Sequence, residues 1–128
     1  AAATRARVLY VEDDAVNALL VRELLASRGD IDLVVADSGT AGLEEARAQR
    51  PDLILLDMQL PDMDGLAVLK ALRADPATAS VTCVALSANA MPSDREAARD
   101  AGFDEYWTKP IVFATFRAGL ARLLGRPG

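Results

Sequence analysis

An unbroken apolar run that ends in a carboxylate is the feature that most constrains the fold of this chain. Residues 53–56 are four consecutive branched apolar residues, and Asp57 follows them directly. Such a run, bounded by turn-forming residues, is typical of a strand buried on both faces of a parallel sheet. Asp57 would then lie at the carboxyl edge, where open α/β sheets bind ligands. An aspartate in this place also commonly caps the following turn, and this stretch alone favours neither role.

Strand-like and helix-like segments alternate five times along the chain. Strands are predicted over residues 8–11, 33–36, 53–56, 81–86 and 106–108. Helices are predicted over residues 15–28, from 38 to before Pro51, over 65–74, from 93 to Gly102, and from 113 onward. This alternation predicts a parallel sheet covered on both faces by right-handed crossovers.

The first predicted helix has apolar residues at helical spacing, namely Val16, Leu19, Leu20 and Leu24. We expect them to form its buried stripe, and we expect Gly29 to end the helix as a C-cap glycine.

The fourth predicted helix has a weak apolar face. Ser93 and Glu96 have the spacing of a capping box, and Gly102 is expected to close the helix. The stripe consists only of small residues, which are Ala97, Ala98 and Ala101. This helix is therefore expected to be the least firmly anchored.

Composition excludes several classes of function. A single chain of 128 residues has the size of one domain, and its net charge of −5 disfavours a nucleic-acid surface. The absence of histidine removes Ser-His-Asp, Cys-His and histidine-metal sites. The one cysteine, Cys83, lies in an apolar run and is expected to be a small buried hydrophobe. No stretch resembles a membrane span or a signal peptide, so we expect a soluble, cytoplasmic domain without membrane contacts.

Five polar residues directly follow predicted strands: Glu12, Asp13, Asp57, Ser87 and Lys109. In a parallel sheet all of them meet at one edge. Three carboxylates gathered there need a cation, and Mg²⁺ favours hard oxygen ligands. The ammonium and the hydroxyl can each hold a phosphoryl oxygen, which completes the parts of a phosphoryl-transfer site. Taken singly, the lysine is an ordinary surface residue and the serine a cap, but the set of five makes that interpretation improbable.

Four motifs give the chain a resemblance to the receiver domains of two-component response regulators. They occupy residues 11–14, 55–65, 85–88 and 102–110, and the resemblance extends from about residue 7 to residue 124. It implies a doubly wound, flavodoxin-like α/β fold with strand order 2-1-3-4-5 and five helices.

The resemblance implies a role for each residue at the sheet edge. Asp57 corresponds to the phosphoacceptor, which takes a phosphoryl group from a partner phosphohistidine. Mg²⁺ or Mn²⁺ would be bound by Glu12, Asp13, Asp57 and the main-chain carbonyl of Gln59. Glu12 replaces the more frequent aspartate, which leaves open whether it touches the metal or a metal-bound water.

Further roles follow from the same resemblance. Lys109 corresponds to the family's invariant lysine, and the Lys109–Pro110 peptide is expected to be cis. Ser87 and Tyr106 correspond to a conformational switch, although Tyr106 also fits as an ordinary half-buried strand tyrosine. Gln59 and Asn89 occupy the variable positions that tune the lifetime of the acyl phosphate.

The motifs are most similar to receivers attached to hybrid sensor histidine kinases, which pass phosphoryl groups to a histidine phosphotransfer partner. A stand-alone or trimmed response regulator is the alternative. We expect residues 1–6 to be a linker or a cloning remnant, 7–125 the receiver domain and 126–128 a tail. The resemblance also allows a homodimer through the fourth helix, fifth strand and fifth helix.

Two other classes share part of this pattern. Haloacid-dehalogenase-like phosphatases also use an aspartyl phosphate, but they place an acid/base aspartate where this chain has Gln59, which cannot shuttle a proton. A receiver that serves only as an interaction module would usually have lost Asp13, Asp57 or Lys109. The expected protein is therefore a phosphoacceptor domain and not a conventional enzyme, although a hybrid parent protein would be a histidine kinase.

Overall fold

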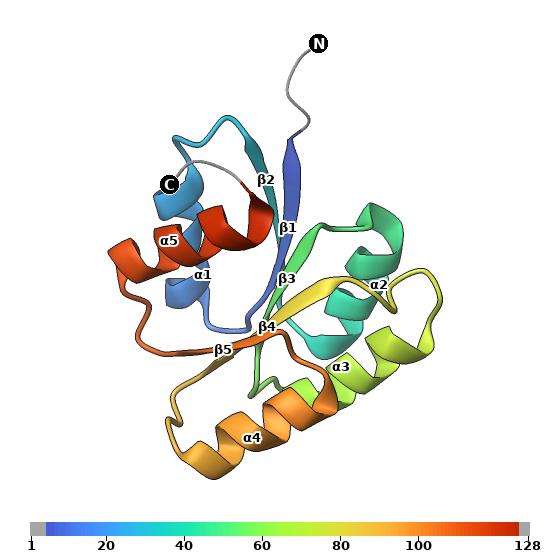
Figure 1. The fold of residues 1–128 in the computed structure, drawn as a ribbon. Helices are drawn as coiled ribbons and strands as arrows, with labels where there is room; N and C mark the ends of the chain where they lie inside the picture. Colours follow the sequence, from blue (N-terminus) through green and yellow to red (C-terminus); the bar gives the residue numbers. More distant parts are fainter. Residues whose placement is uncertain (1–4, 126–128) are drawn as a thin grey trace.

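The structure is a computed structural model that describes residues 5–125, in which five strands alternate with five helices (Figure 1). The strands are β1 (Ala6–Val11), β2 (Ile31–Ala36), β3 (Leu53–Asp57), β4 (Thr82–Ser87) and β5 (Glu105–Thr108). The helices are α1 (Ala15–Leu25), α2 (Gly39–Gln49), α3 (Gly65–Ala74), α4 (Pro92–Ala101) and α5 (Phe113–Leu124).

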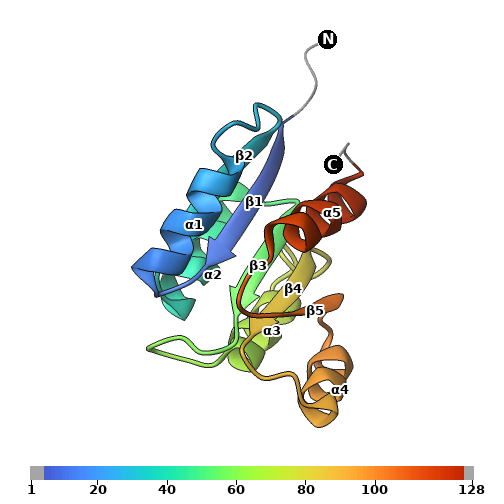
Figure 2. The same ribbon diagram turned by 90° about the vertical axis from the view of Figure 1, so that its left-hand side faces the viewer.

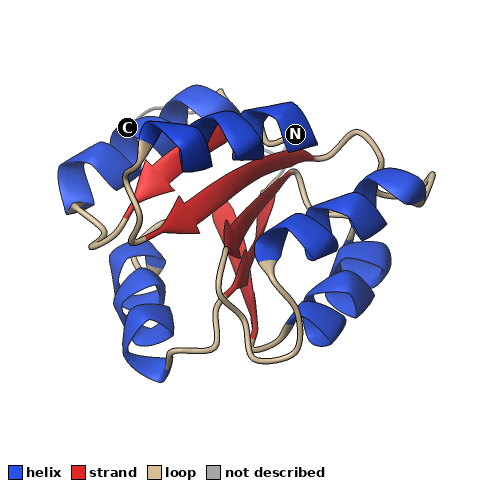
Figure 3. Ribbon diagram, turned by 90° about the horizontal axis from the view of Figure 1, so that it is seen from below, coloured by secondary structure: helices blue, strands red, loops and turns tan. Residues whose placement is uncertain are grey.

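The strands form one parallel sheet in the order β2-β1-β3-β4-β5. This order confirms the flavodoxin-like fold expected from the sequence. Because every strand runs the same way, the loops that follow the strands gather at one edge, which Figure 3 views from below.

Helices cover both faces of the sheet: α1 and α5 lie on one face, and α2, α3 and α4 on the other (Figures 1 and 2). Strand β3 shows how the sequence achieves this, because successive strand side chains point to opposite faces. Leu53 and Leu55 pack in the core under α1 and α5, while Ile54 and Leu56 pack in the core under α2, α3 and α4. All four are fully buried.

The predicted buried stripe of the first helix is wrong. The residues of α1 that pack on the sheet are Ala18, Val21 and Leu25, whereas Leu19 is 56% exposed. Val16 and Leu20 are exposed as well, and only Leu24 of the predicted four is partly buried. Asp14 caps α1 through the amide of Val16 and so fixes where the helix starts. Ala18, Val21 and Leu25 share the face that packs on the sheet, and apolar spacing alone does not reveal which of two apolar faces packs.

Two predicted helix ends are also wrong. Helix α1 ends at Leu25, where Ala26 keeps a right-handed backbone, so Gly29 is not the C-cap. The predicted capping box at Ser93 does not form, because α4 already begins at Pro92 and Met91 at its N-cap makes no side-chain bond. Proline suits the first helical position, since it lacks the N–H group that would need a partner there.

Helix α4 is weakly anchored, as the sequence predicts. Ala98 is its one buried residue. Gly102 ends the helix with φ of 115°, a conformation that glycine adopts without strain.

Cys83 is a buried residue of β4 and packs in the core under α2, α3 and α4. Burial raises the pKa of its thiol to about 12, so the thiol stays protonated. This agrees with its interpretation as a small hydrophobe.

The predicted domain boundaries fall near the ends of the described chain. Strand β1 begins at Ala6, one residue inside the predicted linker. Residues 1–4 and the predicted tail 126–128 lie outside the described residues. Within residues 5–125, no helix has both the length and the apolar character needed to span a membrane.

Candidate functional site

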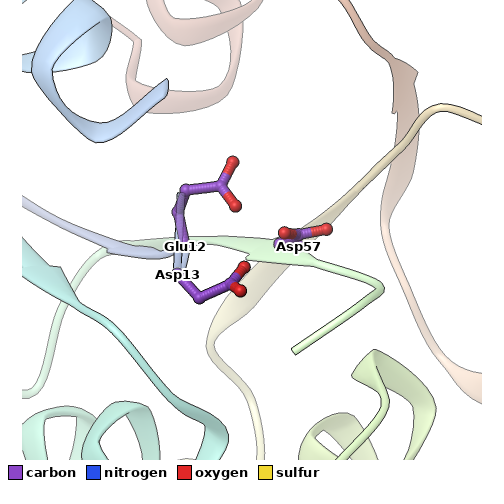
Figure 4. A group of neighbouring side chains, drawn as sticks. All are labelled: Glu12, Asp13 and Asp57. Atoms are coloured by element: carbon purple, nitrogen blue, oxygen red, sulfur yellow. The ribbon is translucent and has the colours of Figure 1, made fainter. Parts of the chain in front are cut away.

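Three carboxylates meet at the carboxyl edge of the sheet. Glu12 and Asp13 follow β1, and Asp57 ends β3 beside it. Figure 4 shows the three side chains close together, and one oxygen from each lies within 4.8 Å of the others. Glu12 and Asp57 are buried, whereas Asp13 is exposed. The sequence therefore predicts this cluster correctly.

Lys109 provides positive charge to the cluster from the end of β5. Its Nζ lies 2.8 Å from Oε1 of Glu12 and 3.3 Å from Oδ2 of Asp57. The lysine side chain is only 17% exposed, so it is not an ordinary surface residue. Because it faces both buried carboxylates, it neutralises part of their charge.

Tyr10 completes the surroundings of Glu12. Its hydroxyl is fully buried and donates a hydrogen bond of 2.8 Å to Oε1 of Glu12. Tyr10 is not among the residues predicted for the site, although Tyr10 and Glu12 are two positions apart and so point to the same face of the sheet. Burial and the neighbouring glutamate raise the pKa of Tyr10, so it remains a donor.

The two buried carboxylates differ in their affinity for protons. Burial raises the pKa of Asp57 to about 7, and the adjacent Glu12 acts in the same direction. Burial alone would also raise the pKa of Glu12, but its interactions with Asp57, Lys109 and Tyr10 outweigh it and lower the pKa to about 2. In the metal-free protein the proton is therefore held more readily by Asp57 than by Glu12.

The residues of the site fit a divalent cation. Oε2 of Glu12 is buried and has no hydrogen-bond partner among the described residues, and such an oxygen is costly unless a ligand or water satisfies it. Three carboxylates face a single ammonium here, which leaves a negative excess. Carboxylate and carbonyl oxygens are the ligands that Mg²⁺ and Mn²⁺ prefer.

The loop between β3 and α3 is held against Asp57. The amide of Gln59 donates a hydrogen bond of 3.1 Å to Oδ1 of Asp57. Gly65 begins α3 so close to the strand end that a Cβ there would lie 2.9 Å from Cα of Met58. Glycine is therefore required at this position for the loop to return so tightly.

Ser87 ends β4, which pairs with β3 on the side away from β1, and Asn89 follows two residues later. Ser87 lies at the end of β4 and is partly buried, and its Oγ accepts a hydrogen bond of 3.0 Å from the amide of Asn89. The side chain of Asn89 accepts a bond from the amide of Met91, so it caps the turn that leads into α4.

Tyr106 links β5 to the same turn. Its ring is half-buried against the core under α4, and its hydroxyl donates to the main-chain carbonyl of Asn89. The guanidinium of Arg95 on α4 lies 5.2 Å from the ring centroid. The N-terminal half of the weakly anchored α4 therefore contacts Tyr106 directly.

The end of β5 is fixed by its main chain. The amide of Lys109 donates a hydrogen bond of 2.8 Å to the carbonyl of Ser87, and the Lys109–Pro110 peptide bond is cis, which agrees with the expectation from the sequence. Lys109 and Ser87 are thus brought together at the sheet edge, next to the carboxylates.

The strand order and an acidic cluster faced by a partly buried lysine together define a receiver domain of two-component signalling. The sequence profile of the response regulator receiver domain matches residues 8–121. The chain belongs to this family.

Individual response regulators and receiver domains are also similar to this chain. The chain is 37% identical over 118 residues to the polar-differentiation response regulator DivK of Brucella anthropi, covering 92% of this chain and 95% of that protein. The receiver domain of a sensor histidine kinase from Pseudomonas aeruginosa, with magnesium in its active-site cleft, is 34% identical, with a TM-score of 0.85 over 95% of this chain and 99% of the other. Chemotaxis protein CheY4 of Vibrio cholerae is 25% identical, with a TM-score of 0.87 over 94% and 99%.

Proposed function

We propose that this receiver domain accepts a phosphoryl group on Asp57 from a phosphohistidine of a partner protein. The observation that carries the proposal is the placement of Asp57, a buried carboxylate 3.3 Å from the ammonium of Lys109 and within a cluster of acids. A receiver is not a classical enzyme, since the acceptor is part of the chain itself. Family membership favours this function over the phosphatase alternative.

The proposed transfer is a single displacement at phosphorus. A carboxylate oxygen of Asp57 forms a bond to the phosphorus, and the bond from phosphorus to the imidazole nitrogen of the partner breaks. The nitrogen keeps the bonding electron pair. The products are an acyl phosphate on Asp57 and a neutral imidazole, whose proton is carried on the other ring nitrogen. Lys109 lies where its ammonium can donate a hydrogen bond to a phosphoryl oxygen on Asp57, because its Nζ already contacts Asp57.

Glu12, Asp13, Asp57 and the main-chain carbonyl of Gln59 are the residues that would hold Mg²⁺ or Mn²⁺. A divalent cation there would supply charge neutralisation for the incoming phosphoryl oxygens. The buried oxygen of Glu12 that lacks a partner supports this assignment. So does the magnesium in the cleft of the Pseudomonas aeruginosa receiver.

We further propose that Ser87 and Tyr106 report the modified state. The hydroxyl of Ser87 moves toward the phosphoryl group on Asp57. The ring of Tyr106 then moves with the turn that carries Asn89. The existing hydrogen bond between Tyr106 and the Asn89 carbonyl supports such coupling. Because α4 has a single buried residue, a small free-energy difference suffices to shift it.

The biological setting remains part of the proposal. The motifs favour a receiver that belongs to a hybrid histidine kinase and hands its phosphoryl group to a histidine phosphotransfer protein, with residues 7–125 as the domain. The similarity to a sensor-kinase receiver supports this setting. The similarity to DivK supports the alternative of a stand-alone regulator. A homodimer through α4, β5 and α5 and a cytoplasmic location complete the proposal.

Incubation with magnesium and a small acyl phosphate donor tests the proposed function. Intact mass spectrometry should show the addition of one phosphoryl group, and chelation of the metal should prevent it. A protein that binds magnesium and never gains a phosphoryl group would instead be an interaction module. Steady turnover of a phosphomonoester would point to a phosphatase.

Magnesium binding should weaken as the pH falls through about 7. The raised pKa of Asp57 means that the metal must displace a proton below that pH, whereas above it the carboxylate is already free. The apparent affinity, measured by calorimetric titration at several pH values, should fall by about tenfold per pH unit between pH 6 and 5 and be nearly constant above pH 8. A constant affinity from pH 5 to 8 would contradict the raised pKa.

Replacement of both Gln59 and Asn89 by alanine should change the lifetime of the acyl phosphate while leaving acceptance intact. Both side chains are exposed beside the site, where they can affect the approach of water to phosphorus. The loop carbonyl of residue 59 remains in the variant. Decay followed by mass after removal of the donor measures the effect, and the same decay rate as in the wild type would refute the tuning role.

A further inference from the structure

Asp62 lies in the loop between β3 and α3, which follows the proposed phosphoacceptor Asp57, and it joins this loop to the first turn of α2. Its Oδ1 accepts a hydrogen bond of 2.8 Å from the amide of Gly39, and its Oδ2 accepts bonds of 2.9 and 2.7 Å from the amide and the hydroxyl of Thr40. These hydrogen bonds lower the pKa of Asp62 to about 2, and the bonds with Thr40 have the largest effect. The carboxylate is thus ionised at any physiological pH.

The first turn of α2 is capped from two different parts of the chain. Ser38, at the N-cap, accepts the amide of Ala41. Asp62 accepts hydrogen bonds from the amides of Gly39 and Thr40, the two residues that precede Ala41 in the helix. A charged acceptor makes stronger hydrogen bonds than a hydroxyl and also interacts favourably with the helix dipole. The cap provided by Ser38 therefore stabilises only α2. The cap provided by Asp62 also fixes the loop between β3 and α3.

The loop tip and α2 are also in close van der Waals contact. A Cβ at Gly39 would lie 2.3 Å from Cγ of Met63, so this glycine leaves the space that Met63 fills. The tip of the loop is consequently held by a packed side chain as well as by the carboxylate of Asp62.

The base of the same loop carries Gln59. Its amide bonds to Asp57, and Gln59 forms an isolated antiparallel bridge with Asp64. The amide of Gly65 bonds to the carbonyl of Met58. The loop is therefore closed at its base next to the phosphoacceptor and fixed at its tip by α2.

We propose that Asp62 is a positioning residue for the metal site: by tying the loop tip to α2, it holds the main-chain carbonyl of Gln59 in place for the cation. This inference rests on the proposed function of the site. Asp62 itself touches neither the metal nor the phosphoryl group. Its contribution is that the loop needs no reordering when the metal binds. Loss of a group bonded directly to a metal ligand lowers metal affinity by about 10- to 100-fold, and we expect the lower end here because Asp62 bonds to α2 and not to a ligand.

The test compares two variants of the full chain that each remove a cap from α2. Asp62→Ala removes the bonds that join the loop to the helix, while Ser38→Ala removes only the local cap. The Kd for magnesium alone, measured by calorimetry, should rise about tenfold in Asp62→Ala and less than about twofold in Ser38→Ala. Thermal unfolding shows how far each variant is destabilised. Asp62→Asn, which keeps one acceptor oxygen, should recover part of the affinity.

Amide hydrogen exchange of the metal-free protein gives a second readout. Exchange at Gln59 should become faster in Asp62→Ala and stay unchanged in Ser38→Ala. A magnesium-binding wild type together with wild-type affinity in Asp62→Ala would overturn the role of Asp62. Equal losses of affinity in the two alanine variants would also overturn it, because they would trace the effect to α2 and not to the loop. A wild type that binds no magnesium would instead reject the proposed function of the site.

Discussion

Asp57→Asn is expected to abolish phosphoryl acceptance. The amide has nearly the shape of the carboxylate but is not a nucleophile toward phosphorus, and no other carboxylate of the cluster ends a strand as Asp57 does. After incubation with magnesium and an acyl phosphate donor, the intact mass of this variant should stay unchanged under conditions that modify the wild type completely.

The fold of Asp57→Asn should be retained, which makes the variant a clean test. Because burial raises the pKa of Asp57, its charge costs free energy in the metal-free folded protein at pH 8, and the neutral amide avoids that cost. The melting temperature at pH 8 without metal should therefore equal or exceed that of the wild type. Full modification of the variant would show that another residue is the acceptor.

Lys109→Met should slow phosphorylation by about 100-fold while leaving the acceptor in place. Methionine keeps much of the length of the side chain but provides neither charge nor donor. The incoming phosphoryl oxygens lose their ammonium contact, and the pKa of Asp57 should rise further because the lysine favours its ionised form. The rate of mass gain at a fixed donor concentration measures the effect.

Lys70→Met is the matched control for this variant. Lys70 is the other lysine of the chain and lies exposed on α3, away from the contacts of the site. The same change of residue type there should leave the rate within about twofold of the wild type, as expected for a surface charge. Equal rates for wild type and Lys109→Met would remove Lys109 from the proposed machinery.

The sheet and its acidic edge could be predicted because the signals are local and repeated. The apolar run before Asp57 can form little else than a buried strand, and the alternation with helices fixes a parallel sheet. Once the strands are parallel, residues such as Glu12, Ser87 and Lys109 must meet at one edge. Residue order along the chain is sufficient for this inference.

Side-chain contacts between distant segments could not be predicted in the same way. Helix α1 has two faces with apolar residues, and only packing reveals that Val21 is buried while Leu19 is exposed. Asp62 looks like one more acid in an acid-rich loop, and its bonds to α2 depend on how two loops meet in space. Tyr10 is closer to predictable, since it shares a sheet face with Glu12.

Helix ends were mispredicted where two signals compete. Gly29 is a good C-cap residue by type, yet α1 stops earlier, at Leu25. Ser93 and Glu96 have capping-box spacing, yet Pro92 starts the helix one residue before them. Gly29 therefore lies outside its helix and Ser93 inside, so a residue type that suits a helix end does not by itself mark that end.

The location of the phosphoryl group tests the central claim most directly. Wild-type protein would be phosphorylated with an acyl phosphate donor and magnesium, treated with borohydride to reduce the acyl phosphate, and analysed by peptide mass spectrometry. We predict a single reduced site, at Asp57, that disappears when the metal is chelated. Modification at any other residue, or none at Asp57 in a protein that binds magnesium, would contradict the account.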